Sequence, residues 1–260
     1  MLELYHWEPN TFFLKPLVAL AEKAAIYTSR YFDPTQFEQF AAGFPLDVES
    51  RLHLEREGPV LVHDGTIISS SFFLLEYIAE AIPGPALLPE DAYDRYRARA
   101  WGQISALSLA SAVSALGCAR YLAPTLRQRP VNAVRSQIEA IEPPERRAAW
   151  AAVLQDGAEA QLAGARKQLA VPVARIESAL AGSPWLAGAQ YSIADIDIFA
   201  MLMGVPELTP DVVSVSASPH IMAFLQRMHA RPAVRAALAL SRTGRPTEAY
   251  VPGSEPSRWG

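Results

Sequence analysis

Three consecutive serines, Ser69, Ser70 and Ser71, stand directly before the apolar run that extends from Phe72 to Ile78. Serine hydroxyls at a helix start accept hydrogen bonds from the first backbone N–H groups, and other N–H groups of the first turn stay free. Free N–H groups and the positive end of the helix dipole attract carboxylates. The serine run therefore predicts a helix start that can bind a carboxylate.

Gly58-Pro59 opens the apolar stretch that precedes these serines. Asp64-Gly65 divides that stretch into two short runs, and an Asp-Gly pair between apolar runs predicts a β-hairpin. Because Pro59 lacks the N–H group for a ladder hydrogen bond, we expect it at the first residue of a strand or on an edge strand. The serines thus follow a predicted hairpin whose first strand begins at a proline.

The single cysteine and the five histidines offer weaker candidates for chemistry. Cys118 lies in a predicted core helix next to Gly117, where we expect a buried and inert thiol. One cysteine also excludes an internal disulfide framework. The histidines show no metal-ligand spacing, so we expect no metal site; they are His6, His53, His63, His220 and His229.

The composition of the 260-residue chain is typical of a globular protein with a sizeable core, since 50% of its residues are hydrophobic and 19% are charged. A formal net charge of -4 gives no electrostatic attraction to nucleic acid or to an anionic membrane. No apolar run reaches the length of a membrane span, and the N-terminus shows no signal-peptide pattern. We expect a cytoplasmic protein without nucleic-acid or membrane partners.

The elements that must position the serines form a predicted α/β half over residues 1–81. Residues 2–7 and 26–32 are expected to be strands on either side of a helix over 12–25, which makes a βαβ unit. The hairpin and a helix over 71–81 complete the order. A polar, partly helical connection over 35–57 joins the two parts.

A proline-rich linker over residues 82–90 leads to a second half with only helical signals, the predicted all-α domain over 91–243. An irregular insertion is expected over 126–143, and a tail over 244–260, rich in Pro, Gly and Ser, is expected to be disordered. The predicted helices cover residues 93–120, 145–180, 192–203, 219–230 and 232–240.

This order of strand, proline, hairpin and serine-started helix, followed by a proline-rich linker and a helical half, resembles the cytosolic glutathione transferases. Ser192 and Asp195 lie where that superfamily has a capping box. Within the superfamily the chain is similar to bacterial glutathione-dependent β-aryl etherases of lignin breakdown. The stretches that carry this likeness are residues 14–17, 33–40, 63–65 and 173–177.

The resemblance implies a thioredoxin-like domain that binds glutathione, as a co-substrate, through the backbone beside Pro59 and through Ser70 and Ser71 at the helix start. Gly58 stands where the family has an aliphatic residue, and Ser70 where it has an acidic or amide residue. Gln39 is a further expected glutathione contact. Glutathione would react as its thiolate.

The same resemblance places the residue that activates the thiol in the loop after the first strand. Where the similar etherases have a polar Asn-Ser pair, this chain has Phe12-Phe13. Asn10 and Thr11 remain as donors for the sulfur; the alternative is that both only cap the first helix. An aromatic co-substrate would contact residues for which core packing is the alternative, namely Trp7, Phe12, Phe13, Trp101 and Tyr121.

The reaction that the resemblance implies is attack of the glutathione thiolate on the carbon next to a benzylic carbonyl, with displacement of an aryloxide from an aromatic ether. Three readings stay open: an active chain that forms a homodimer, a less competent subunit of a heterodimer with a related transferase, and a non-catalytic ligand-binding module. The departures at Phe12-Phe13 and Ser70 motivate the second reading.

Overall fold

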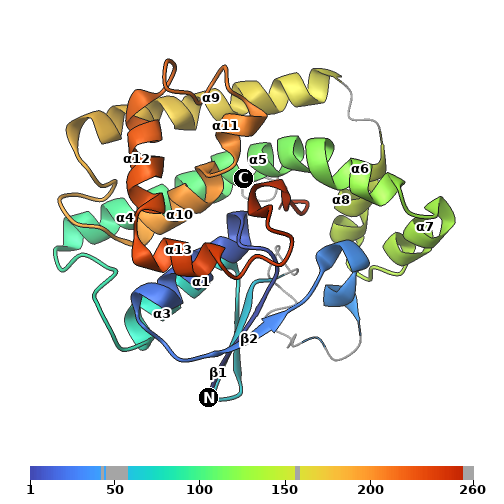
Figure 1. Cartoon of the computed structure of the whole chain (residues 1–260), viewed down its shortest axis with the longest axis horizontal. Coiled ribbons are helices and arrows are strands. Elements are labelled where there is room, and N and C mark those ends of the chain that lie inside the picture. Colours follow the sequence, from blue (N-terminus) through green and yellow to red (C-terminus); the bar gives the residue numbers. More distant parts are fainter. Residues whose placement is uncertain (42–43, 45–57, 156–158, 254–260) are drawn as a thin grey trace.

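The computed structural model describes residues 1–41, 44, 58–155 and 159–253. A four-stranded sheet with flanking helices forms the N-terminal part, and helices form the rest (Figure 1). Its strand order is β2-β1-β3-β4; β1 and β2 are parallel, and the other two pairs are antiparallel. The strands are β1 (Leu2–His6), β2 (Thr28–Tyr31), β3 (Val60–His63) and β4 (Thr66–Ser69). The expected fold class is confirmed.

The helix α1 (Thr11–Glu22) joins the two halves of the molecule. It packs against α3 (Ser71–Ala81) of its own half and against α10 (Ile193–Leu202) and α13 (Pro232–Leu238) of the helical half. Because helices cover it on both sides, every residue from Thr11 to Leu20 is buried. The start of α1 is therefore held between the halves.

The connection after β2 begins with two short 3-10 turns, η1 (Pro34–Gln36) and η2 (Glu38–Phe40). The Asp33 carboxylate starts η1 by accepting a hydrogen bond from the Thr35 N–H at 2.9 Å. Phe37 packs its ring on Trp150 of the helical half, with ring centroids 4.8 Å apart. Most of the predicted connection over 35–57 lies outside the described residues.

The helical half begins with one continuous run, residues 92–127, in which two π-helical turns, η3 (Ser105–Leu109) and η4 (Cys118–Leu122), join three α-helices. The expected irregular insertion contains the helix α7, because Val134 and Ile138 of one face are buried. The remaining helices are α4 (Ala92–Ile104), α5 (Ala110–Gly117), α6 (Ala123–Arg127), α7 (Val131–Glu139), α8 (Pro144–Leu154), α9 (Glu159–Gly182), α11 (Val205–Leu208) and α12 (Pro219–His229).

The run over 92–127 is also, in the described part of the chain, the one helix whose length and composition would allow it to cross a membrane. Its most apolar window is 56% buried inside the protein. Core helices of soluble proteins have the same length and composition, so this run is weak evidence for a membrane span.

Residues 241–253, here called the C-terminal strap, are ordered, which corrects the expectation of a disordered tail from residue 244. They contain the short turn η5 (Pro246–Glu248), and Ala249, Tyr250 and Val251 are buried. In Figure 1 the strap is the dark red segment that returns from α13 to the middle of the molecule, beside α1 and α5. Residues 254–260 of the expected tail lie outside the described residues.

Candidate functional site

The serine run lies at the start of α3, as expected, but Ser70 does not cap the helix, since its side chain makes no hydrogen bond to the helix start. Ser70 has φ 70° and ψ 121°, a conformation that residues with a side chain rarely adopt and that is typical of functional sites. The buried Ser71 hydroxyl accepts a hydrogen bond from Lys15 Nζ at 3.2 Å. Ser69 Oγ is buried without a hydrogen-bond partner among the residues the structure describes.

Gly58-Pro59 has a cis peptide bond and directly precedes β3. A Cβ atom on Gly58 would lie 3.1 Å from Phe32 Cζ and 3.2 Å from Phe13 Cε1. Two aromatic rings therefore fill the space that an aliphatic side chain at position 58 would need. The φ of +90° at Gly58 also favours glycine. The absence of a side chain at Gly58 therefore leaves room for the Phe13 ring, so these two departures from the family pattern fit one another.

Asn10 and Thr11 lie at the start of α1, but they are not equally available to a ligand. The Asn10 side chain does not cap the helix; its Nδ2 donates a hydrogen bond to the Ala249 carbonyl of the strap at 2.8 Å, and its Oδ1 is buried without a partner in the described chain. Thr11 has φ 42°, which is strained for a β-branched residue. The Thr11 hydroxyl makes no hydrogen bond to another described residue. Thr11 is the freer of the two donors.

A buried ion pair that sequence reasoning did not identify lies behind Ser71. Lys15 Nζ is 2.7 Å from Asp197 Oδ1, and the Ser105 hydroxyl donates to the same oxygen at 2.7 Å. The signal in the sequence was a charged residue inside the apolar stretch of each of two helices, Lys15 in α1 and Asp197 in α10, because buried ionised groups require a partner. Through Lys15, the helical half supports the start of α3.

The Gln39 side chain is buried in a way that suits a residue in contact with a ligand. The residue has no exposed surface, and neither Oε1 nor Nε2 of its side chain has a hydrogen-bond partner among the described residues. Buried amides are nearly always hydrogen-bonded, so such a group calls for a partner that the described part of the chain does not supply.

The aromatic residues expected around a co-substrate form two groups. Trp7 and Phe13 meet edge to face with ring centroids 6.2 Å apart, and the Lys15 ammonium lies 5.5 Å from the centroid of the Phe12 ring. Tyr121 stacks on Tyr250 of the strap, with centroids 6.0 Å apart and an interplanar angle of 7°. The strap links the groups, because Ala249 bonds to Asn10 beside Phe12.

Trp101 lies apart from both groups. Its Nε1 donates to the Leu186 carbonyl at 2.9 Å, a contact within the helical half. Twenty residues of continuous helix separate Trp101 from Tyr121, which at about 1.5 Å per residue places them roughly 30 Å apart. The structure therefore does not bring these two residues together in one pocket.

Two titratable residues, His6 at the end of β1 and Glu8 in the loop that follows, have structural partners. His6 contacts the Trp7 carbonyl through Nδ1 and Ser29 Oγ through Nε2, both at 2.7 Å, and burial lowers the pKa of His6. Glu8 is buried and accepts hydrogen bonds from Tyr31 and from the strap. Cys118 is buried, as expected. Among the described residues, no three His, Cys, Asp or Glu side chains gather in a way that could hold a metal.

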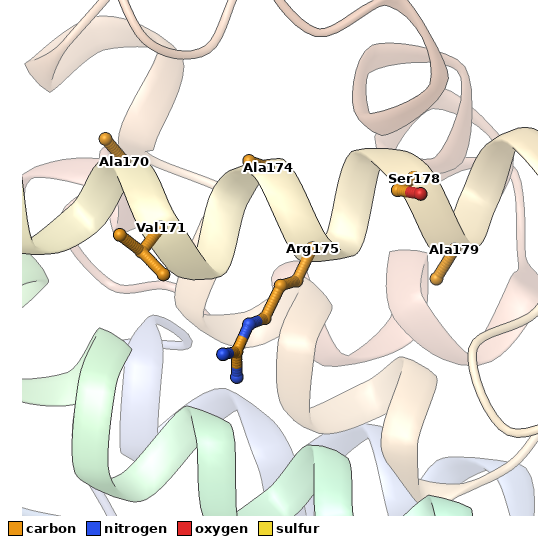
Figure 2. Close-up of a pocket in the computed structure, with 6 residues that line it drawn as sticks. All are labelled: Ala170, Val171, Ala174, Arg175, Ser178 and Ala179. Carbon is orange, nitrogen blue, oxygen red and sulfur yellow. The ribbon is translucent and has the colours of Figure 1, made fainter.

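Two hollows in the helical half lie away from the residues predicted to bind glutathione. Figure 2 shows the six residues of α9 that line the first hollow. This hollow is shallow and has a volume of about 660 Å³. The second, of about 700 Å³, lies between α5, α8, α9 and the end of the strap, and Cys118 is among its lining residues. Neither is lined by the residues predicted to bind glutathione.

Comparison with known proteins gives a consistent picture. Residues 137–232 match the family model of the glutathione S-transferase C-terminal domain. Protein LigF of Sphingobium sp. (strain NBRC 103272 / SYK-6) is 28% identical over 240 residues, which cover 90% of this chain and 91% of LigF. The resemblance to the superfamily and to a β-etherase is confirmed.

Solved structures show the same fold. The crystal structure of β-etherase LigF superposes with a TM-score of 0.84 at 27% identity and covers 92% of this chain and 99% of its own. Glutathione transferase F7 from Populus trichocarpa superposes with a TM-score of 0.69 at 19% identity, over 92% and 98% of the two chains. The expected glutathione transferase architecture is confirmed.

Proposed function

We propose that this chain is a glutathione transferase of the β-etherase type, which uses the glutathione thiolate to displace an aryloxide from a β-aryl ether ketone. The observation that carries the proposal is that Asn10, Gln39 and Ser69 are among the residues with buried polar atoms that have no partner in the described chain. Gln39 is itself an expected glutathione contact, Asn10 is one of the two expected donors to the sulfur, and Ser69 directly precedes Ser70. The full-length similarity to LigF supports the choice of reaction.

The carboxylate of the γ-glutamyl end would bind at the start of α3, where Ser70 leaves the helix uncapped. Lys15 donates to the Ser71 hydroxyl oxygen, and this donation strengthens the Ser71 O–H as a donor to a carboxylate because hydrogen bonds in a chain polarise one another. The cysteinyl backbone would pair with the extended chain beside Pro59. Gln39 would contact the remainder of the peptide.

Thr11 is the best candidate for holding the thiolate, because the strap occupies the Asn10 amide. A hydroxyl donor at the N-terminus of α1 would stabilise the negative charge together with the helix dipole and thereby lower the pKa of the thiol. The thiolate then attacks the carbon next to the benzylic carbonyl. As the C–S bond forms, the C–O bond breaks, its electron pair leaves with the aryloxide, and solvent protonates the aryloxide.

The proposal is tested with the purified chain, glutathione and a β-aryl ether ketone. We expect release of one phenol for each glutathione conjugate formed, and a heat of glutathione binding by calorimetry. No heat at millimolar glutathione together with no phenol release would refute the proposal. We also propose that the protein is cytoplasmic and that it forms a homodimer.

A second candidate is a subunit that becomes active only beside a related transferase chain. Phe13 favours it, because an aromatic ring stands where the similar etherases have a hydroxyl-bearing pair. Co-expression with such a chain, followed by gel filtration and the same assay, separates the two. An active homodimer would exclude the heterodimer.

A further inference from the structure

We propose that Arg129 and Trp150 of the helical half are positioning residues for glutathione, because they fix the turns η1 and η2 and thereby hold the Gln39 amide where the peptide binds. The inference rests on the proposed function, since it concerns how the same site is held. It gives the insertion over 126–143, and the helix α8 that follows it, a role in binding that sequence reasoning did not indicate.

The segment that carries Gln39 has a strained backbone at one residue. Its two turns contain three residues each, and Phe37 joins them with φ 63° and ψ 25°, in the left-handed region. A residue with a side chain adopts this conformation at a cost in free energy, so contacts elsewhere must maintain it. Such contacts come from the helical half.

Trp150 of α8 holds the ring of the strained residue. The rings of Phe37 and Trp150 have centroids 4.8 Å apart and planes inclined by 52°. Phe37 is 7% exposed and Trp150 0%, so the contact lies inside the core. Aromatic pairs at this separation contribute stability beyond the burial of their surface. The contact therefore fixes the side chain at the junction of the two turns.

Arg129, in the turn between α6 and α7, contacts the same segment in two further ways. Its Nη1 donates a hydrogen bond to the Thr35 carbonyl, and its guanidinium carbon lies 5.8 Å from the centroid of the Phe37 ring. Its Nη2 donates to Gln137 Oε1 of α7 at 2.7 Å. Because the guanidinium is planar and rigid, the bond to α7 orients the nitrogen that bonds the turn. Arg129 therefore ties the turn to the helical half.

Gln39 follows Phe37 by two residues, within η2. Its side chain is fully buried, and no hydrogen bond to another described residue orients its amide. The backbone that carries it therefore determines where the amide lies. With the γ-glutamyl end at the start of α3 and the cysteinyl backbone beside Pro59, the glycyl residue is the part of glutathione left for Gln39. Arg129 and Trp150 thus act on the glycyl contact through the turn.

The test compares glutathione with γ-glutamylcysteine, which lacks the glycyl residue, by calorimetry on the full chain. We expect the native chain to bind glutathione about tenfold more tightly, on the order of what one or two hydrogen bonds contribute. Arg129→Ala should remove most of this preference by weakening glutathione alone, with the affinity for γ-glutamylcysteine unchanged. The matched control is Arg135→Ala, a change at an exposed arginine of α7, which should keep the native preference.

Phe37→Leu examines the same positioning without a change of charge. It keeps an apolar side chain but removes the ring that Trp150 and Arg129 contact, and it should shift the preference in the same direction. Arg129→Lys keeps a charged donor but lacks the planar fork that reaches Thr35 and Gln137 together. Its preference should lie between those of the native chain and of Arg129→Ala.

A double-mutant cycle shows whether Arg129 acts through Gln39. Gln39→Ala should lose the preference for glutathione by itself, and Arg129→Ala should then have little further effect, because the two residues serve one contact. Equal losses of affinity from Arg129→Ala in the two backgrounds would mean independent roles and would overturn the assignment.

The outcomes separate the two proposals. A native chain that binds neither ligand would refute the proposed function and this inference with it. A native chain that binds glutathione, but whose preference stays the same in Arg129→Ala and Phe37→Leu, would overturn only the positioning role. Circular dichroism and gel filtration verify that each variant is folded.

Discussion

Lys15 Nζ and Asp197 Oδ1 lie 2.7 Å apart, and this ion pair joins the two halves of the molecule inside the core. The two side chains are 3% and 1% exposed. Lys15 belongs to α1 and also contacts Ser71 at the start of α3, while Asp197 belongs to α10 and also accepts from Ser105. The pair therefore couples the packing of the halves to the proposed carboxylate site.

Removal of one partner of this pair should destabilise the protein strongly, because it leaves an uncompensated buried charge. Asp197→Ala is expected to lower the free energy of unfolding by about 3–5 kcal/mol. The control is Glu3→Gln, which breaks the exposed pair between Glu3 and Arg30 and should cost about 0–1 kcal/mol. Urea unfolding monitored by circular dichroism measures both, and equal losses would contradict a buried role for the pair.

Thr11→Ala should lower kcat by about a hundredfold, on the order of the loss when one donor to a developing or stabilised anion is removed. Thr11→Ser retains the hydroxyl and should recover most of the rate. Thr28→Ala, a change at an exposed threonine of β2, serves as the control. The rate of phenol release and the pH dependence of thiolate absorbance in the glutathione complex measure the effect. Full activity of Thr11→Ala would show that a residue other than Thr11 activates the glutathione thiol.

Ser71→Ala should weaken glutathione binding by about tenfold or more, because a hydrogen bond to a charged group contributes about 1.5–3 kcal/mol. The effect should appear in the glutathione Kd, with a smaller change in kcat. Calorimetry with glutathione gives the Kd, and the exposed serine of α9, Ser178→Ala, provides the comparison. An unchanged Kd would remove Ser71 from the proposed site.

Attachment of the strap should depend on pH through Glu8. Burial acts to raise the pKa of Glu8, but hydrogen bonds from Ser241, Tyr31, Arg242 and Thr243 outweigh it and hold this pKa below its usual value of 4.5. Because the pKa is lower in the folded state, Glu8 contributes stability that is present above pH 4.5 and is lost as the pH falls through the folded pKa.

Glu8→Gln should therefore remove part of the acid sensitivity of the native chain. The measurement is urea unfolding at neutral pH and at several values below pH 4.5, for the native chain and the variant. The native chain should lose more stability than the variant over this range. Identical pH profiles would show that Glu8 does not hold the strap by its charge.

Local features of the fold could be predicted from the sequence because neighbouring residues determine them. Asp64-Gly65 forms the expected two-residue turn, with His63 paired to Thr66, because φ is 50° at Asp64 and 85° at Gly65. Ser192 and Asp195 form the expected capping box. Apolar spacing likewise predicted most helices. The position of Gly58-Pro59 before a strand and of the serines at a helix start followed from the same local rules.

Contacts between distant parts of the chain could not be predicted in this way. Composition predicted a free tail, yet the Asn10 amide binds the carbonyl of Ala249, 239 residues further along the chain. Spacing likewise could not show that Phe13 and Phe32 fill the space above Gly58. The sequence by itself determined the elements and the residue types of the site. Only tertiary packing decided which side chains remain available to a ligand, because burial and hydrogen-bond partners depend on residues that no local pattern relates.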